Sequence, residues 1–324
     1  MTELIRRLAR DRRLTRKEYE TLIRGCTPQL QQELAQLADR ERRAHYGTTV
    51  FIRAAMEISS ICKNDCLYCA QRRSSPDCQR YRLRPREILE RCEEAGSLDV
   101  QSFLLRGGED GFYNDEILES LILRLKERYP GCAVTLALGE RGRESFERLY
   151  NAGADRYLLR HEAADRQLYE QLHPAEMSYD LRLHALNNLK DIGYQTGCGF
   201  IVGLPGQTPL HLARDLKYIQ EFQPHMVDVG PFLPQPGTPF ADFPAGSGDL
   251  TNFMISLIRI IRPDALITAP ADLEGSVLAG ANVVCWSVYP AAPSNEALSA
   301  LRCRIADIGF EASTARGDCA AYSI

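Results

Sequence analysis

Three cysteines stand close together in the motif Cys62-Lys-Asn-Asp-Cys66-Leu-Tyr-Cys69. Thiolate sulfur is a soft ligand that suits iron–sulfur clusters and zinc. Three thiolates within eight residues can reach three corners of one [4Fe–4S] cube, whereas such clusters usually take four cysteines. The next cysteine, Cys78, lies nine residues further on, beyond an arginine-rich stretch. The motif therefore predicts a [4Fe–4S] cluster with one iron left open for a small-molecule ligand.

Two other interpretations of this motif are open. Zinc usually takes four ligands from paired elements, and no second Cys-x-x-Cys pair accompanies this one. Three unrelated buried cysteines would be unusual in a loop that also holds Lys63, Asn64 and Asp65. The spacing favours the cluster over both.

Short apolar runs that alternate with amphipathic, charged stretches indicate the elements that position this motif. Such alternation predicts βα units and a parallel sheet, and near-continuous apolar strands fit a sheet covered on both faces. Eight units in about 240 residues predict an α/β fold, a (β/α)8 barrel of the TIM type, with a doubly wound open sheet as the alternative. The predicted strands are Val50–Ile58, Val100–Leu105, Ala133–Leu138, Arg156–Leu159, Thr196–Val202, Met226–Val229, Ala265–Thr268 and Asn282–Trp286.

The predicted barrel occupies residues 46–290. An N-terminal helical extension (1–45) precedes it, in which Thr27 and Pro28 begin a new helix, and a C-terminal helical segment (291–324) closes it. The cysteine motif follows the first strand, so it lies on the first βα loop. Active sites of barrel enzymes are built from these loops at the C-terminal face.

Composition excludes several other classes of protein. The 324 residues carry 39 basic and 43 acidic side chains, and the 44% hydrophobic content excludes disorder, collagen and coiled coil. The best apolar run, Phe253–Ile261, is broken by Arg259 and is shorter than the ~18 residues of a membrane span. Met1–Leu14 lacks the apolar core of a secretory signal. We therefore expect a cytoplasmic protein without membrane contact.

The N-terminal region is more basic than the rest of the chain. Residues 1–54 hold 12 Arg and Lys against 7 Asp and Glu. A basic arm can touch nucleic acid. Acids are mixed among these basic residues, and no aromatic residue is interleaved among Arg6, Arg7, Arg10, Arg12 and Arg13. We therefore interpret the region as a solvated helical face.

The cysteine motif, with the aromatic Tyr68 before its last cysteine, resembles the signature of radical S-adenosylmethionine (radical SAM) enzymes. The resemblance implies two cofactors, a [4Fe–4S] cluster on Cys62, Cys66 and Cys69 and SAM on the open iron. It implies that an electron donor reduces the cluster and that SAM is then cleaved to methionine and a 5′-deoxyadenosyl radical. An open iron also predicts sensitivity to oxygen.

Other positions match the SAM-binding parts of this superfamily. Gly107-Gly108-Glu109, after the second predicted strand, is implied to meet the methionine ammonium of SAM. The backbone of Tyr68 and the side chain of Ile201, in the stretch Gly199-Phe-Ile-Val-Gly203, are implied to contact adenine. Taken alone, these glycines predict only a tight turn and a core strand.

Ionisable residues end the fourth predicted strand at Arg160-His161-Glu162. Glu162 can accept hydrogen bonds from ribose hydroxyls or from the SAM ammonium. Arg182, on the next helix, can pair with the SAM carboxylate. A surface ion pair between Glu162 and Arg182 is the plainer alternative.

Further blocks are similar to the HydE family of [FeFe]-hydrogenase maturases, in the biotin synthase-like group. They include Tyr157-Leu-Leu-Arg-His-Glu162, Val202-Gly-Leu-Pro-Gly-Gln-Thr208 and Gly230-Pro-Phe232. The resemblance implies a closed internal cavity and an organometallic iron substrate carrying CO, cyanide and cysteine. It also implies other hydrogenase maturases as partners.

Thr135, Arg156 and Thr268 match the anion-binding cavity of that family, and Arg106 and Tyr289 are looser candidates for substrate contacts. Some positions near this cavity depart from the family. Cys285-Trp286-Ser287 replaces a common Pro-Asn loop, and Cys303 and Cys319 lack the spacing of a second cluster. Two alternatives therefore stay open, a methylornithine-type radical reaction on a small amino acid and a cluster scaffold without turnover.

Overall fold

The computed structural model describes residues 1–270 and 272–322. The strands are β1 (Thr49–Ser59), β2 (Ser102–Gly107), β3 (Ala133–Ala137), β4 (Arg156–Leu158), β5 (Gln195–Val202), β6 (Met226–Pro231), β7 (Leu266–Ala269), β8 (Val283–Ser287) and β9 (Glu311–Ser313). The helices are α1 (Thr2–Asp11), α2 (Arg16–Arg24), α3 (Pro28–Tyr46), α4 (Pro85–Gly96), α5 (Asp115–Arg128), α6 (Arg143–Asn151), α7 (Arg166–Leu172), α8 (Tyr179–Ile192), α9 (Pro209–Phe222), α10 (Gly248–Ile261), α11 (Leu273–Leu278) and α12 (Asn295–Asp307).

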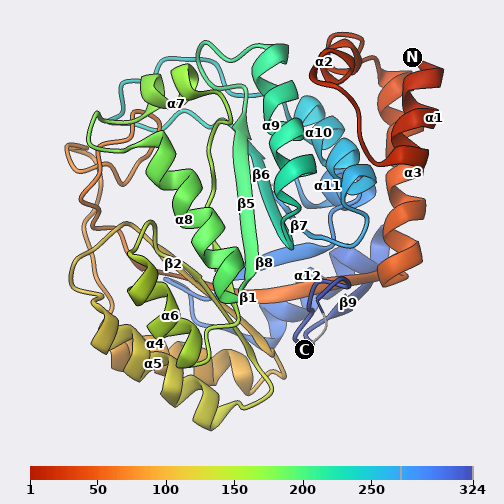
Figure 1. The fold of residues 1–324 in the computed structure, drawn as a ribbon. Coiled ribbons are helices and arrows are strands. Elements are labelled where there is room, and N and C mark those ends of the chain that lie inside the picture. The colour runs from red at the N-terminus through yellow and green to blue at the C-terminus, as the bar shows by residue number, and fades with distance from the viewer. Residues whose placement is uncertain (271, 323–324) are drawn as a thin grey trace.

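The strands β1 to β8 form a closed parallel barrel, with helices around the outside (Figure 1). Each strand pairs with the next, and β1 pairs with both β2 and β8, which closes the ring. The predicted (β/α)8 barrel is confirmed, and the open sheet is wrong. All eight predicted strands overlap an observed strand because each is an apolar run between two amphipathic helices.

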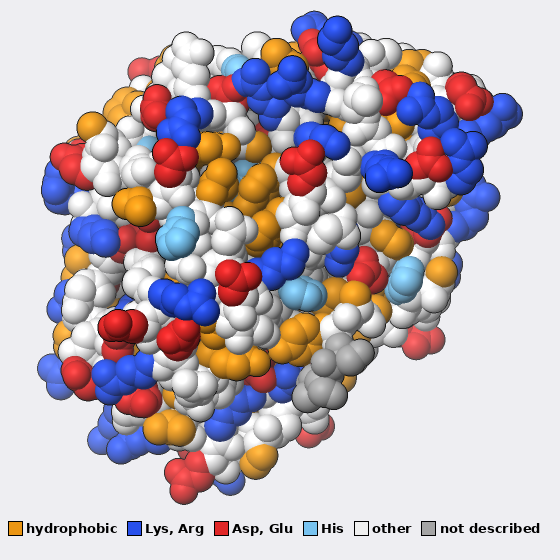
Figure 2. Space-filling model, viewed as in Figure 1, with side chains coloured by type: hydrophobic (Ala, Val, Ile, Leu, Met, Phe, Trp, Pro, Cys, Tyr) orange, Lys and Arg blue, Asp and Glu red, His pale blue; other side chains and the backbone are white. Residues whose placement is uncertain are grey.

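The N-terminal helices cover one side of the barrel (Figure 1). α2 packs on α9, and α3 packs on α10. Thr27 caps α3 with Pro28 at its first position, as the sequence predicts. Many of the basic side chains here pair with acids, such as Arg7 with Glu18 at 2.5 Å. Figure 2 accordingly shows blue and red side chains intermixed over this region.

The C-terminal segment is not helical throughout, which corrects the expectation for residues 291–324. After α12 the chain forms β9, which pairs in parallel with the first residues of β1, from Thr49 to Phe51. These residues offer free backbone groups because β8 pairs only from Phe51 onward and β2 only from Ala54. The described chain then continues beneath the N-terminal ends of the strands, and residues 323–324 lie outside the described residues.

In the described residues, no helix combines the length and the apolar character that a membrane crossing requires. The eleven cysteines are all free thiols.

Candidate active site

The three cysteines of the motif lie on the loop after β1, at the C-terminal end of the barrel, and all three are half-buried. The backbone N–H groups of Asn64 and Glu109 both lie 3.4 Å from Cys62 Sγ, as donors. Burial raises the pKa of the Cys66 thiol, and the neighbouring Cys69 raises it further. A thiolate at Cys66 therefore needs a bound cation, and backbone N–H groups directed at sulfur are what an iron–sulfur cluster uses.

In the described residues, no three His, Cys, Asp or Glu side chains converge closely enough to hold a single metal ion. A four-iron cluster places its irons and sulfides between its cysteines, so it requires a wider spacing than one ion does. The loop fits such a cluster by its donor set and by its N–H groups.

A polar network that the sequence analysis missed fixes this loop. Asp65 accepts hydrogen bonds from Arg72 Nε at 2.8 Å and from the Ser74 backbone N–H at 3.1 Å. Arg80 donates to the Ser60 carbonyl at 2.6 Å. The arginine-rich stretch after the motif was the available signal, because buried loop carbonyls need donors.

The last residue of β2, Gly107, and the following Gly108 must be glycines because the cysteine loop approaches them closely. A Cβ on Gly107 would meet the Ser59 carbonyl oxygen at 2.7 Å, and a Cβ on Gly108 would meet the Ile61 carbonyl oxygen at 2.3 Å. The structure therefore brings this turn directly against the predicted cluster ligands.

Glu109 extends from the same turn toward β3. Its carboxylate lies 2.9 Å from Lys63 Nζ and accepts from the Glu140 backbone N–H at 3.2 Å. Gly139, with φ of 77°, leaves room for it, since a Cβ there would meet Glu109 Cγ at 2.1 Å. The Glu109 carboxylate is thus bound by the cysteine loop, through Lys63, and by the loop after β3, through Glu140.

Glu162 lies just beyond β4 and has φ of 64°, a left-handed conformation that is uncommon outside glycine. Its backbone N–H donates to the Gly199 carbonyl of β5 at 3.0 Å, which holds this conformation. Its carboxylate pairs with Arg160 at 3.2 Å, and Arg160 lies 3.6 Å from Asp228 of β6. Strained residues of this kind gather at functional sites.

Arg182 of α8 does not pair with Glu162, so the alternative of a Glu162–Arg182 surface pair is wrong. Its Nε pairs with Glu140, and its Nη1 donates to the Arg160 carbonyl at 2.8 Å. The guanidinium is buried at the site, beside Glu162 and the cysteine loop.

Tyr68 and Ile201 belong to one apolar cluster at the C-terminal end of β5. The Tyr68 hydroxyl lies 3.0 Å from His173 Nε2, and His173 Nδ1 lies 2.7 Å from the Tyr169 carbonyl. His173 therefore fixes Tyr68, a contact that the sequence analysis missed because the two residues are far apart in the chain.

A cavity of about 530 Å³ lies inside the barrel next to these groups. Its lining carries four arginines and two acids, so its formal charge is positive. In the described residues, Arg53 and Arg106 form no ion pair, whereas Arg160 and Arg182 do. The lining residues are Arg53, Leu104, Arg106, Ala137, Gly139, Leu158, Leu159, Arg160, Glu162, Arg182, Asp228, Thr268, Ala269, Pro270 and Cys285.

The predicted substrate residues fall into two groups. Arg106 and Thr268 line this cavity. Tyr289 packs against Tyr81 and is not among the residues that line the cavity. Thr135 is buried in β3, where its register partner is Arg156.

Arg156 does not reach the cavity lining, which corrects its expected role. It is the first residue of β4, and its guanidinium is directed to the closed lower end of the barrel, where Asp318 accepts from Nη2 at 2.7 Å. The sequence could not show this, because the partner lies 162 residues away. Arg53 was missed, although an arginine within an apolar strand was a signal.

Comparison with known proteins agrees with a cluster and SAM site at this end of the barrel. A family model for the radical SAM superfamily matches residues 56–219. The [FeFe] hydrogenase maturase subunit HydE of Thermotoga maritima is 40% identical over 89% of this chain and 84% of its own. The 3-methylornithine synthase of Methanosarcina barkeri is 30% identical over 86% of this chain and 80% of its own. A crystal structure of methylornithine synthase (PylB) superposes with a TM-score of 0.84 and 26% identity, over 96% of this chain and 97% of that one.

The chain therefore belongs to the radical SAM superfamily, whose enzymes use a [4Fe–4S] cluster and SAM. Within this superfamily it is a HydE-like enzyme.

Proposed function

We propose that the chain cleaves SAM reductively at a [4Fe–4S] cluster held by Cys62, Cys66 and Cys69, and that it does so in the maturation of [FeFe] hydrogenase. The single observation that carries the maturase assignment is the 40% identity to HydE across most of both chains. The chemistry that the cluster supplies when bound is the one-electron reduction that splits SAM into methionine and a 5′-deoxyadenosyl radical.

The residues around the cluster loop divide the binding of SAM among them. We assign the SAM ammonium to the turn at Gly107, Gly108 and Glu109. We assign its ribose to Glu162, whose carboxylate is held by Arg160. The charge of Arg182 favours the SAM carboxylate, and its own pairing with Glu140 keeps it in place.

Adenine fits the apolar cluster that contains Tyr68 and Ile201. An aromatic and an aliphatic side chain in one cluster suit a flat ring, and the His173 contact keeps Tyr68 in a fixed orientation.

The substrate that the cavity suits is small and anionic. Arg53 and Arg106 line it without ion-pair partners among the described residues, so a bound anion would satisfy them. An iron complex carrying CO, cyanide and cysteine, made by another hydrogenase maturase, has this character.

The test uses protein reconstituted anaerobically with iron and sulfide. With SAM and dithionite, we expect 5′-deoxyadenosine from the wild type and none from Cys66→Ala. Cys78→Ala, in the same loop region, is the matched control and should keep its activity. Absence of 5′-deoxyadenosine from the wild type would contradict the proposal.

A second assay separates the two substrate classes. Addition of the iron complex should increase 5′-deoxyadenosine formation, and lysine, the isomer of methylornithine, should not. The structural likeness to methylornithine synthase makes lysine the appropriate competitor. Stimulation by lysine alone would replace the maturase assignment with an amino-acid rearrangement.

A further inference from the structure

Cys285 of β8 faces the substrate cavity. It is the register partner of Arg53 in β1, and both residues line the cavity. Their chain neighbours Ile52 and Val284 belong to the main hydrophobic core. Because side chains alternate along a strand, Arg53 and Cys285 point the other way, into the barrel, and lie next to each other. Cys285 is half-buried and supplies the only sulfur atom among the described residues of the lining.

Charged groups surround the Cys285 thiol. Burial raises the pKa of this thiol, whereas the positive charges of Arg53 and Arg106 act in the opposite direction. Asp228 is the acid that acts on the thiol, and it lies 3.6 Å from Arg160. Cys285 therefore keeps its proton until a cation takes the proton's place, and a metal ion deprotonates a thiol that coordinates it.

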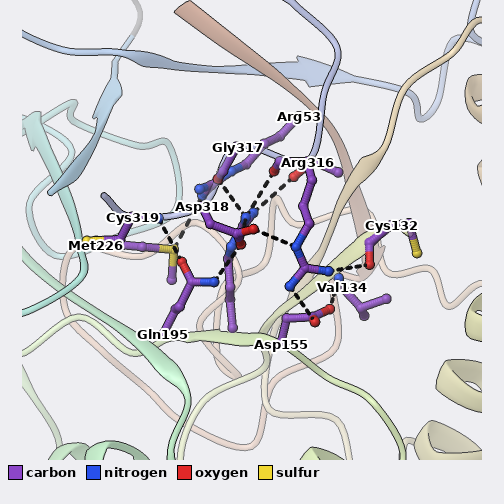
Figure 3. A network of polar contacts seen from close by, with 12 residues as sticks. Arg53, Cys132, Val134, Asp155, Gln195, Met226, Arg316, Gly317, Asp318 and Cys319 are labelled. Carbon is purple, nitrogen blue, oxygen red and sulfur yellow. Dashed lines mark hydrogen bonds and ion pairs between the residues drawn. The ribbon is translucent and has the colours of Figure 1, made fainter. Parts of the chain in front are cut away.

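Arg53 is the positive charge beside this thiol, and its donors are not satisfied. It is 3% exposed, its Nη1 lies 3.5 Å from Met226 Sδ, and its Nε and Nη2 have no hydrogen-bond partner among the described residues. Figure 3 shows it beside the C-terminal tail, where Asp318 is engaged by Arg156 at 2.7 Å and by Arg316 at 2.6 Å. A buried guanidinium needs partners, so Arg53 favours negative charge that arises next to Cys285.

We propose that Cys285 is a ligand of the iron in the substrate complex: its thiolate binds the iron, and Arg53 balances the negative charge of that thiolate. Thiolate sulfur is a soft ligand that suits iron. The inference rests on the proposed function, because it concerns the iron complex that the cavity takes.

The binding step is an exchange of ligands on the iron. One Fe–S bond forms, one weakly held ligand such as water leaves the iron, and the proton of the Cys285 thiol passes to solvent. No electron is transferred. A thiolate on the cavity wall selects a metal complex over a free amino acid, because the amino acid offers no metal for it to bind.

The test follows the CO ligands of the iron complex by infrared spectroscopy. The reconstituted holoenzyme is titrated anaerobically with the complex, without SAM and without reductant. A thiolate donates electron density to iron, which strengthens back-donation to CO and lowers the CO stretching frequency. We expect the bands of the complex bound to the wild type to lie below those of the free complex. Bound and free bands at the same frequency would overturn the proposal, and so would an absence of binding.

Cys285→Ser keeps the size of the side chain and replaces the soft sulfur with oxygen. We expect the band shift to disappear and the Kd for the complex to rise at least about tenfold. Cys303→Ser removes an exposed thiol on α12 and is the matched control, which should keep both the shift and the Kd. The wild-type shift in Cys285→Ser would refute the proposal. If the serine variant does not fold, Cys285→Ala gives the same test.

Arg53→Gln separates ligation from charge. Because the thiol remains, the band shift should persist, whereas the Kd should rise because the thiolate loses its counterion. A wild-type Kd in Arg53→Gln would overturn the role of Arg53.

The outcomes also separate this inference from the proposed function. The titrations contain no SAM, so a lack of 5′-deoxyadenosine in the activity assay would contradict the proposed function and leave the infrared result valid. Stimulation of SAM cleavage by the complex without a band shift would overturn the role of Cys285 alone.

Discussion

Glu162 combines two features at the scale of a single residue. Its backbone is left-handed, which costs about 1 kcal/mol or more, and its carboxylate is held against Arg160 between β4 and β6. The Gly199 carbonyl of β5 accepts the hydrogen bond from the Glu162 N–H that maintains this geometry. A residue with only a structural role would not require both strain and a charge at this position.

Glu162→Gln should therefore weaken SAM binding while it changes the stability little. The amide keeps the side chain's shape but loses the charge that favours an ammonium or polarises ribose hydroxyls, so we expect about a tenfold higher Kd for SAM. Equilibrium dialysis against the reconstituted protein measures it. Glu170→Gln, on the exposed face of α7, is the control, and equal Kd values for all three proteins would contradict the assigned role.

Gly108→Ala should reduce retention of the cluster. The added Cβ would lie 2.3 Å from the Ile61 carbonyl and 2.7 Å from Cys62 Cβ, so the cysteine loop must shift. Gly111→Ala on the same turn meets nothing within 4 Å and is the matched control. Iron and sulfide content after reconstitution measures the effect. Full cluster content in Gly108→Ala would contradict the prediction, because it would show that the cysteine loop can shift without losing the cluster.

At the scale of elements, α10 shows why the hydrophobic pattern of a sequence does not reveal how a helix is buried. This helix is apolar on nearly all sides because the barrel packs on one side of it and α1 and α3 on another. Arg259, which breaks its apolar run in the sequence, is fully buried. It donates to the carbonyl of Ala265 at 2.7 Å and to Asn282 Oδ1 at 2.8 Å, and so joins α10 to the residues that directly precede β7 and β8.

Arg259→Leu should destabilise the fold strongly. Its loss leaves several buried carbonyl oxygens without donors, and we expect the free energy of unfolding to fall by about 3 kcal/mol or more. Chemical denaturation followed by circular dichroism measures it. Arg86→Leu, whose side chain on α4 is 89% exposed, should change stability by less than about 0.5 kcal/mol. Similar values for the two variants would refute the role of Arg259.

The elements were predictable from the sequence where one local pattern determines them. The eight barrel strands and the start of α3 at Pro28 belong to this group. The direction of Arg156 and the strand β9 were not predictable. Arg156 is directed by contacts with a tail 160 residues further along the chain, and β9 forms by pairing with β1, which is also distant in the sequence. In the site, the motif located the cysteine loop and its glycine turn, whereas Arg53 and His173 required the three-dimensional contacts.

At the scale of the whole molecule, both terminal regions are fastened to the barrel. The buried His173 and the half-buried His225 link its stability to pH. Burial lowers the pKa of His173 to about 4 and, with Arg262 and Lys190, that of His225 to about 4. The Thr196 N–H donates to His225 Nδ1 at 3.1 Å, so this nitrogen must be unprotonated in the folded state. Both rings are neutral in the fold and charge readily once it opens.

The stability should therefore fall as the pH decreases from about 6.5 to about 4. The folded pKa lies below the unfolded value of about 6.5, so the stabilisation is complete above that value and is lost as the unfolded chain takes up protons. His225→Asn keeps an acceptor for the Thr196 N–H and removes one titrating group, so it should reduce the slope of unfolding free energy against pH in this window. Denaturant titrations at several pH values measure the slope. His184→Asn, on the exposed face of α8, should leave it as in the wild type, and an unaltered slope in His225→Asn would show that this ring does not contribute.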